Sequence, residues 1–512
     1  MRPYQILPFT NENLAKALSS KIPEGRILDR AQFLYLKNYL GSTDGINAKT
    51  IVVELDYVSK AYITDYSNYY ATCFQEYERM CKRVHFFNVE FNDERLRKEL
   101  LSESEFLNNH YLGYIVVKPL PDSVIGPTLL ATYGKRENDH QRFFPACKVY
   151  HVNFFGKTLA VQSLAYQEQD TVVSACASVA IWSAFHKTSS LFKTALPSPG
   201  EITKLAGNLF FNYGRIYPNH GLDLTQVCRA IDAIGLVSEV RSSKRFDGEI
   251  FLASRIIYAY LKCGIPILLL IKSSSAPGVS VGHAVTIIGY SKPKPKASNP
   301  SKEITLIADG IDKFYVHDDQ LGPFASYEFS GKTALKTHHW NSSGEKNYLS
   351  YWIHAVVIPV YPKIRVGFED VFDRVDNFDR TFFEFDIFNV ELEWDVYLEE
   401  SNKYKGDLLK SNLDEDLKIK KVTANYPRYI WVAKAQIQGH VFLDLIFDST
   451  DIPSGRCCLD LIVHDIAVAP LLMQVMTEYP KIFTDEIEGP NLDKKIYEGI
   501  INDLSGLIKK PN

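Results

Sequence analysis

The sequence has no apolar run long enough to cross a membrane. Its longest apolar runs are residues 265–271 and 461–473, and the second contains His464, Asp465 and Pro470, whereas a spanning helix needs about 20 apolar residues. The N-terminal residues lack the apolar segment and the small-residue cleavage site of a signal peptide. The 8 cysteines are scattered without regular spacing, which indicates reduced thiols and not a disulfide framework. We therefore expect a cytoplasmic protein.

An excess of charge of either sign is also lacking. The 512 residues include 57 Lys and Arg against 61 Asp and Glu, a formal net charge of −4. This near balance predicts no general nucleic-acid binding and no electrostatic attachment to membranes. Hydrophobic residues make up 46% and charged residues 23%, which are globular proportions and exclude bulk disorder. At about 150 residues per domain, the length predicts two to four domains.

Several site motifs are absent or incomplete. The sequence contains neither the phosphate-loop pattern G-x-x-x-x-G-K-[ST] nor the zinc-binding pattern H-E-x-x-H. Residues 278–282 match G-x-S-x-G, but a nucleophile elbow needs a helix directly after it, and the following residues are strand-like. Cys73, Cys81 and His85 would drift off a common face of one helix, and no second pair completes a metal site. We expect no metal and no cofactor, and we interpret the Lys- and Pro-rich residues 291–303 as an exposed loop.

Three regions are predicted along the chain, and the outer two are expected to be α+β. For the first, residues 1–155, the pattern predicts a helix at 65–82 and strands at 84–91 and 113–121. For the third, residues 361–512, it predicts strands at 429–437 and 441–447 and a helix near 492–508. We find no internal repeat.

The second region, residues 156–360, changes from helices to strands. The predicted helices are 176–186, 201–211, 223–234 and 250–262. The predicted strands are 265–272, 283–290, 304–309 and 313–317. Helices followed by strands are typical of an α+β domain.

Three residue types in the second region suggest nucleophilic catalysis. Cys176 lies where a polar turn becomes a helix of small and apolar residues, and a helix start favours the thiolate, which is the nucleophile. His283 occupies the first position of a strong strand, which is a rigid mount for a general base. Asp318 and Asp319 end a later strand, where a carboxylate could fix the imidazole tautomer. Taken singly, each of these residues is more often structural, and only their order along the chain favours a site.

Two choices within this set remain open at this point. Gln167 and Gln169 both precede the cysteine, and a side-chain amide there could donate to an oxyanion. For the acid we favour Asp318 over Asp319, because alternation along the strand puts Asp318 on the same face as the apolar Val316.

The second region resembles the papain-like cysteine peptidase superfamily. It is most similar to the bacterial branch that includes the double-glycine leader peptidases of bacteriocin exporters. The similar segments are the Gln-then-Cys helix start, the GHAVTIIGY strand at 282–290, the strand that ends in Asp at 318, and GLDLTQVCRAIDAIGLVSEVR at 221–241. The resemblance covers about 200 of the 512 residues. It implies a helical half that carries the nucleophile and an antiparallel sheet that carries the histidine and the aspartate.

The resemblance also implies a role for each residue. Cys176 would be the nucleophile, His283 the general base and acid, and Asp318 the orienting carboxylate. The oxyanion glutamine of the family lies six residues before the cysteine, where this sequence has Asp170. Gln169 is one residue further back, so we assign it this role with a loop that is one residue longer.

The implied activity is that of an intracellular thiol hydrolase. We expect a cysteine peptidase that cleaves a peptide or isopeptide bond in a protein or peptide substrate, such as a regulatory or defence partner. Another acyl-transfer enzyme with the same three residues is an alternative, namely a transglutaminase-like enzyme, a deamidase or an N-acyltransferase. A catalytically inactive papain-like binding module is a further alternative.

Overall fold

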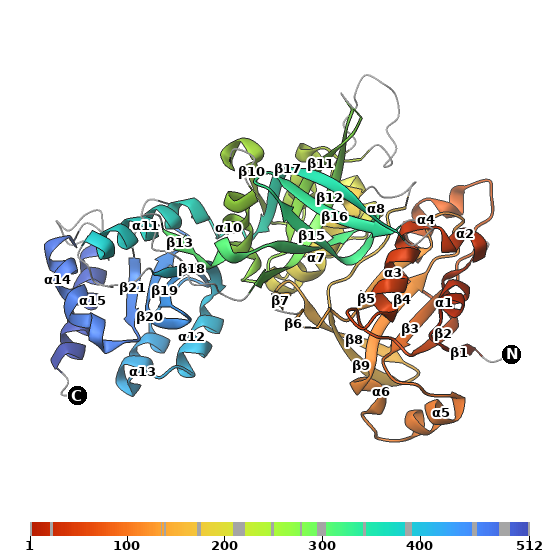
Figure 1. Cartoon of the computed structure of the whole chain (residues 1–512), viewed down its shortest axis with the longest axis horizontal. Helices are drawn as coiled ribbons and strands as arrows, with labels where there is room; N and C mark the ends of the chain where they lie inside the picture. The colour runs from red at the N-terminus through yellow and green to blue at the C-terminus, as the bar shows by residue number, and fades with distance from the viewer. Residues whose placement is uncertain are drawn as a thin grey trace. The chain divides into compact units, whose positions relative to one another are not determined.

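The chain is mixed α+β, as predicted, and divides into two compact units (Figure 1). The computed structural model describes residues 3–20, 24–134, 136–137, 140–170, 176–207, 221–246, 250–276, 279–293, 304–340, 345–384, 392–452, 458–480 and 492–509. Unit 1 consists of Met1–Ile250, Gly264–Pro293 and Asp312–Val360. Unit 2 consists of Phe251–Cys263, Lys294–Ile311 and Tyr361–Asn512.

The first part of unit 1 is built on a five-stranded antiparallel sheet with the strand order β1-β2-β3-β4-β5. Its strands are β1 (Tyr4–Pro8), β2 (Thr50–Tyr57), β3 (Cys81–Phe87), β4 (Tyr111–Val117) and β5 (Ile125–Leu130). Its helices are α1 (Asn11–Leu18), α2 (Glu24–Leu28), α3 (Ala31–Gly41), α4 (Lys60–Asn68), α5 (Asp93–Leu101) and α6 (Phe106–Asn109). In the view of Figure 1, the sheet lies behind α1 and α3.

The centre of unit 1 is a closed barrel of six antiparallel strands. The pairs run β11-β12-β14-β15-β16-β17 and return to β11. The barrel strands are β11 (Ile267–Ala276), β12 (Val279–Pro293), β14 (Lys313–Asp318), β15 (Gly322–Ser330), β16 (Ala334–Trp340) and β17 (Lys346–Val360). Three strands extend it, namely β10 (Val237–Ser242), β7 (His140–Phe143) and β6 (Arg136–Glu137). Strands β12 and β14 pair directly in the barrel, and they carry His283 and Asp318.

Three helices accompany the barrel, namely α7 (Cys176–Phe192), α8 (Pro199–Leu205) and α9 (Leu224–Asp232). Helix α7 is apolar on almost every side and is buried against β12, as its run of small and apolar residues requires. Capping boxes at Ser198 and Asp223 fix the starts of α8 and α9. The predicted boundary between residues 155 and 156 falls in the turn of a hairpin of unit 1, β8 (Lys148–Phe154) and β9 (Lys157–Ser163).

Unit 2 has one five-stranded sheet with the strand order β13-β18-β19-β20-β21. The strands are β13 (Thr305–Leu306), β18 (Glu393–Glu400), β19 (Tyr429–Ile437), β20 (His440–Asp448) and β21 (Cys458–Val463). The helices are α10 (Ile250–Leu261), α11 (Phe368–Glu384), α12 (Ser401–Leu409), α13 (Glu415–Thr423), α14 (Ala469–Glu478) and α15 (Leu492–Lys509). One face packs Ile430, Val432 and Ile446 against Tyr404 and Leu408 of α12.

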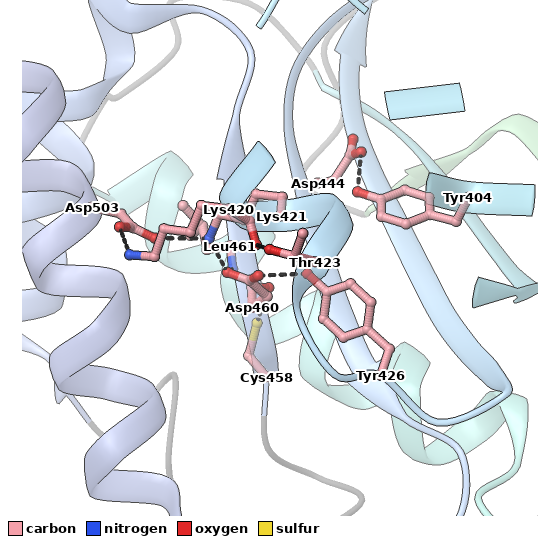
Figure 2. Close-up of polar contacts among 10 residues, drawn as sticks. All are labelled: Tyr404, Lys420, Lys421, Thr423, Tyr426, Asp444, Cys458, Asp460, Leu461 and Asp503. Atoms are coloured by element: carbon pink, nitrogen blue, oxygen red, sulfur yellow. Dashed lines mark hydrogen bonds and ion pairs between the residues drawn. The ribbon is translucent and has the colours of Figure 1, made fainter. Parts of the chain in front are cut away.

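A buried ionic network joins α13, β21 and α15 in unit 2. Figure 2 shows the Lys421 ammonium between two carboxylates, 2.5 Å from Asp460 and 2.8 Å from Asp503. The Tyr426 hydroxyl donates to the other oxygen of Asp460 at 2.6 Å. Lys421 is only 3% exposed, so the two carboxylates, and not water, stabilise its positive charge.

The helix predicted at 65–82 is wrong. The chain forms α4 up to Asn68, a short 3₁₀ turn at Tyr70–Thr72, and then β3 from Cys81. The reason is that the aromatic residues of this segment pack on one another across a reversal of the chain. The Tyr62 hydroxyl donates to the Glu78 carbonyl at 2.9 Å, which a continuous helix would not allow.

Two other expectations also change. Cys81, expected on that helix, is the first residue of strand β3, on which His85 lies as predicted. The strand expected at 304–309 is only Thr305–Leu306, because a 3₁₀ turn follows it at Ile307–Gly310. Residues 279–282 of the G-x-S-x-G match belong to strand β12, and Gly278 lies outside the described residues. Most of the Lys- and Pro-rich segment, residues 294–303, also lies outside them. Within the described ranges, no helix combines the length and apolar character that a membrane span requires.

Candidate active site

Cys176 is the first residue of α7 and is half-buried. The side chains that follow it are buried, including Ala177, Val179, Ala180 and Ile181. The backbone N–H groups of a first helical turn have no partner within the helix, so the positive end of the helix dipole lies beside Cys176.

Helix α7 is fastened to the strand that carries His283. The Thr286 hydroxyl of β12 donates to the Ala180 carbonyl at 2.7 Å. A second bond joins Ser183 of the helix to the Ala165 carbonyl at 2.6 Å. Since Thr286 and Ala180 lie within four residues of His283 and Cys176 respectively, the first bond fixes the register between the two side chains.

His283 and Asp318 are hydrogen-bonded between two neighbouring strands of the barrel. The pairing of Thr286 with His317 puts His283 and Asp318 at the same end of β12 and β14. Nε2 of His283 lies 2.8 Å from Oδ1 of Asp318, and the two residues are 5% and 1% exposed. This contact leaves Nδ1 as the ring nitrogen available for other chemistry.

The imidazole of His283 lies beside two buried carboxyl groups, those of Asp318 and Asp319. Burial lowers its pKa, but Asp318, the neighbouring Cys176 side chain and the charge of Asp319 together raise the pKa well above its ordinary value. Nδ1 of His283 is buried without a hydrogen-bond partner in the protein. The structure brings together three of the four predicted site residues, namely Cys176, His283 and Asp318.

Asp318 is oriented by two further donors that the sequence analysis did not identify. The Gln320 backbone N–H donates to Oδ1 at 2.9 Å, and the Tyr327 hydroxyl donates to Oδ2 at 2.7 Å. Burial raises the pKa of Asp318, but His283 and these bonds bring it below its ordinary value. Tyr327 lies on β15, which begins with Gly322-Pro323, and this turn-forming pair could have indicated that β15 folds back beside β14.

Asp319 is buried beside the same histidine but does not orient it. Its Oδ1 lies 3.8 Å from Nε2 of His283, and its Oδ2 has no hydrogen-bond partner in the protein. Burial raises the pKa of Asp319 to about 7.

His317 has a structural place in the barrel. Its Nε2 donates to the Leu164 carbonyl at 2.9 Å, and its Nδ1 accepts from the Phe324 backbone N–H at 3.2 Å. Burial lowers the pKa of His317 to about 3, so the ring is neutral. With both nitrogens engaged, His317 has no free position for acid–base chemistry.

The residues expected to bind the oxyanion lie just before α7. Gln167 is buried and Gln169 is half-buried. The Asp170 carboxylate is buried and accepts a hydrogen bond from the Tyr70 hydroxyl. Residues 171–175, which set the loop register, lie outside the described residues. The choice of Gln169 over Gln167 therefore stays a prediction.

One group of side chains in the described part of the chain could ligate a metal ion. It consists of His283, Asp318 and Asp319, whose ligand atoms lie within 4.8 Å of one another. A metal at Nε2 would replace the proton that His283 shares with Asp318. Metal binding and the hydrogen bond thus exclude each other.

No family model, curated protein or solved structure matches this chain.

Proposed function

We propose that the protein is a papain-like thiol hydrolase, and specifically a cysteine peptidase with the triad Cys176, His283 and Asp318. One observation carries this proposal: His283 binds Asp318 through Nε2 at 2.8 Å, and the strand that carries His283 is hydrogen-bonded to the helix that begins at Cys176. A nucleophile, a base and an acid that orients the base are the elements of covalent acyl transfer.

In the proposed first half-reaction, the Cys176 thiolate attacks a substrate carbonyl carbon. The new C–S bond pushes the carbonyl electron pair onto oxygen, where the Cys176 backbone N–H and Gln169 would stabilise the oxyanion. When the carbonyl re-forms, the C–N bond breaks and the amine leaves with a proton from Nδ1 of His283. Asp318 keeps the remaining proton on Nε2 throughout.

In the second half-reaction, neutral His283 removes a proton from water. The resulting hydroxide adds to the thioester carbonyl, and collapse of the tetrahedral intermediate releases the acid product and the Cys176 thiolate. The imidazolium is regenerated, which returns the site to its starting state. The substrate class is a peptide or isopeptide bond in a protein or peptide.

The test is a product assay with peptide substrates and intact-mass detection. We expect the wild-type protein to yield two hydrolysis fragments and a transient acyl adduct on Cys176, and Cys176→Ala to yield neither. The matched control is Cys73→Ala, because Cys73 is also half-buried but lies outside the proposed triad. Equal turnover by wild type and Cys176→Ala would overturn the proposal.

A further inference from the structure

The segment that follows Asp318 has an unusual backbone. It consists of residues 319–324, which we call the Asp318 turn, and it includes the first three residues of β15. Within it, Phe324 adopts φ +60° in a fully buried position. A bulky residue keeps this left-handed conformation only where its surroundings enforce it. The Phe324 N–H donates to His317 at 3.2 Å, which is one such constraint.

The other constraints come from helix α3, some 280 residues earlier in the chain. The Tyr35 hydroxyl donates to the Pro323 carbonyl at 2.6 Å in a buried contact. The ring of Tyr35 also fills the space beside Gly322, where any side chain would overlap it. Tyr35 thus makes both a polar and a steric contact with the turn.

Two neighbours on the same face of α3 extend this contact. The Gln32 amide donates to the Asp319 carbonyl at 3.3 Å. The Tyr39 ring stacks on Phe324, with centroids 5.9 Å apart and planes 12° apart. Spacings of three and four residues place Gln32, Tyr35 and Tyr39 on one helical face. That face contacts the turn on either side of Gly322.

The same turn supplies part of the support for Asp318. The Gln320 N–H donates to the Asp318 carboxylate, and the Leu321 N–H donates to the Asp318 carbonyl at 3.1 Å. A shift of the turn would move these donors and rotate the carboxylate away from His283. The Gln320 and Leu321 N–H groups and the Asp318 carboxylate belong to one short segment, so a displacement of this segment moves all three.

We propose that α3 positions Asp318 for His283, with Tyr35 as the positioning residue that holds the turn. This inference rests on the proposed function, because it assigns the support of the same triad. The N-terminal region is then an active part of the site and not an independent appendage.

The experiment measures the pH profile of Cys176 carbamidomethylation by iodoacetamide in the full chain. We expect Tyr35→Phe to move the profile toward higher pH by about one unit, since His283 loses a well-placed anion. The matched control is Tyr39→Phe, which removes a buried hydroxyl from the same helix. That hydroxyl donates to the Ala131 carbonyl and not to the turn, so its profile should stay that of the wild type.

A double variant separates positioning from general loss of structure. If Tyr35 acts through the acid, Tyr35→Phe should have no further effect in an Asp318→Asn background. Additive effects would overturn the proposal, and so would an unchanged profile for Tyr35→Phe. If Tyr35→Phe does not fold, Gln32→Ala provides the same readout with a smaller expected shift, and an unchanged profile would again overturn the proposal. The proposed function fails separately, if His283→Ala leaves wild-type alkylation unchanged.

Discussion

Asp318 and Asp319 are adjacent, buried carboxylates whose pKa values are displaced in opposite directions. Burial raises the pKa of both, but Asp318 receives hydrogen bonds from His283, Gln320 and Tyr327, and its pKa falls. Asp319 has an oxygen without any partner, and its pKa rises to about 7. At neutral pH, Asp318 is therefore ionised, while Asp319 titrates close to neutrality.

This difference predicts unequal effects on turnover. Asp318→Asn should lower kcat by about 10² or more, because the imidazolium loses its charged partner. Asp319→Asn should stay within about tenfold of the wild type, since Asp319 is not hydrogen-bonded to the ring. Steady-state kinetics with one peptide substrate gives both values, and the reverse ranking would contradict the assignment of the acid.

Asp319 should also affect stability in a pH-dependent way. Its folded-state pKa of about 7 lies above the value of about 4 in an unfolded chain. The folded state therefore holds the proton longer, and its stability falls as pH rises from about 4 to about 7. We expect Asp319→Asn to raise Tm relative to the wild type at pH 8 and to change it little at pH 4. A constant difference at both pH values would show that the carboxyl does not titrate in this range.

Cys176 should be the most reactive thiol among the described cysteines. Burial raises the pKa of both Cys81 and Cys147 to about 12, which leaves about one molecule in 10⁵ as thiolate at pH 7. Peptide mapping after brief iodoacetamide treatment should therefore find Cys176 modified first. His283→Ala should slow this modification selectively. Equal labelling of Cys176 in the two proteins would argue against a thiol–imidazole pair.

The two glutamines before the helix should differ in their contribution. We expect Gln169→Ala to lower kcat by about 10²–10³ with little change in KM, which is the effect of losing one oxyanion donor. Gln167→Ala should stay within about tenfold of the wild type. A larger effect for Gln167→Ala would mean that Gln167, and not Gln169, is the oxyanion donor.

The ionic network of unit 2 predicts a strong dependence on one lysine. Lys421→Met leaves Asp460 and Asp503 without their buried cation and should lower the free energy of unfolding by about 3–5 kcal/mol. Lys420 also pairs with Asp503, but its side chain is 56% exposed, so Lys420→Met should cost less than about 1 kcal/mol.

The effect of Lys421→Met should depend on pH. The two lysines keep the pKa of Asp503 below its ordinary value, so the stability that this pair contributes is present at neutral pH and is lost as pH falls through the folded pKa. Urea titrations of both variants at pH 7 and at acidic pH test this. Equal stability of Lys421→Met and wild type at pH 7 would show that the carboxylates find other partners.

Local sequence pattern predicted many elements but not the strand partners. The strand at 429–437 and the helix near 492–508 are confirmed, because each has a clear period and a clear boundary. The false helix at 65–82 arose because aromatic spacing alone does not distinguish one long helix from a folded-back cluster. Closure of the barrel depends on β17 returning to β11, and a contact between distant strands has no local signal.

The same limit applies to the candidate site. Cys176 and Asp318 could be selected because each lies at the end of a recognisable element. His283 lies on the predicted strand but not at its first position, because β12 already begins at Val279. The contacts of α3 with the Asp318 turn could not be predicted, because the residues come from opposite ends of unit 1 and each is an ordinary polar or aromatic side chain. Gly322 offered a turn signal, but nothing in its neighbourhood indicated that a tyrosine fills the space beside it.

The division of unit 2 among three chain segments has a consequence for biosynthesis. Residues 251–263 and 294–311 leave the ribosome before the strands β18 to β21 with which they share a unit. The last strand of unit 1 ends at Val360, so unit 1 can complete its barrel while these two segments still lack their sheet. A fragment that starts at Tyr361 would lack β13, the parallel partner of β18, and would expose an unpaired strand edge. Chain termination between Val360 and α15 should therefore leave a completed barrel that carries aggregation-prone, unassembled segments, a state in which nascent chains would depend on chaperones.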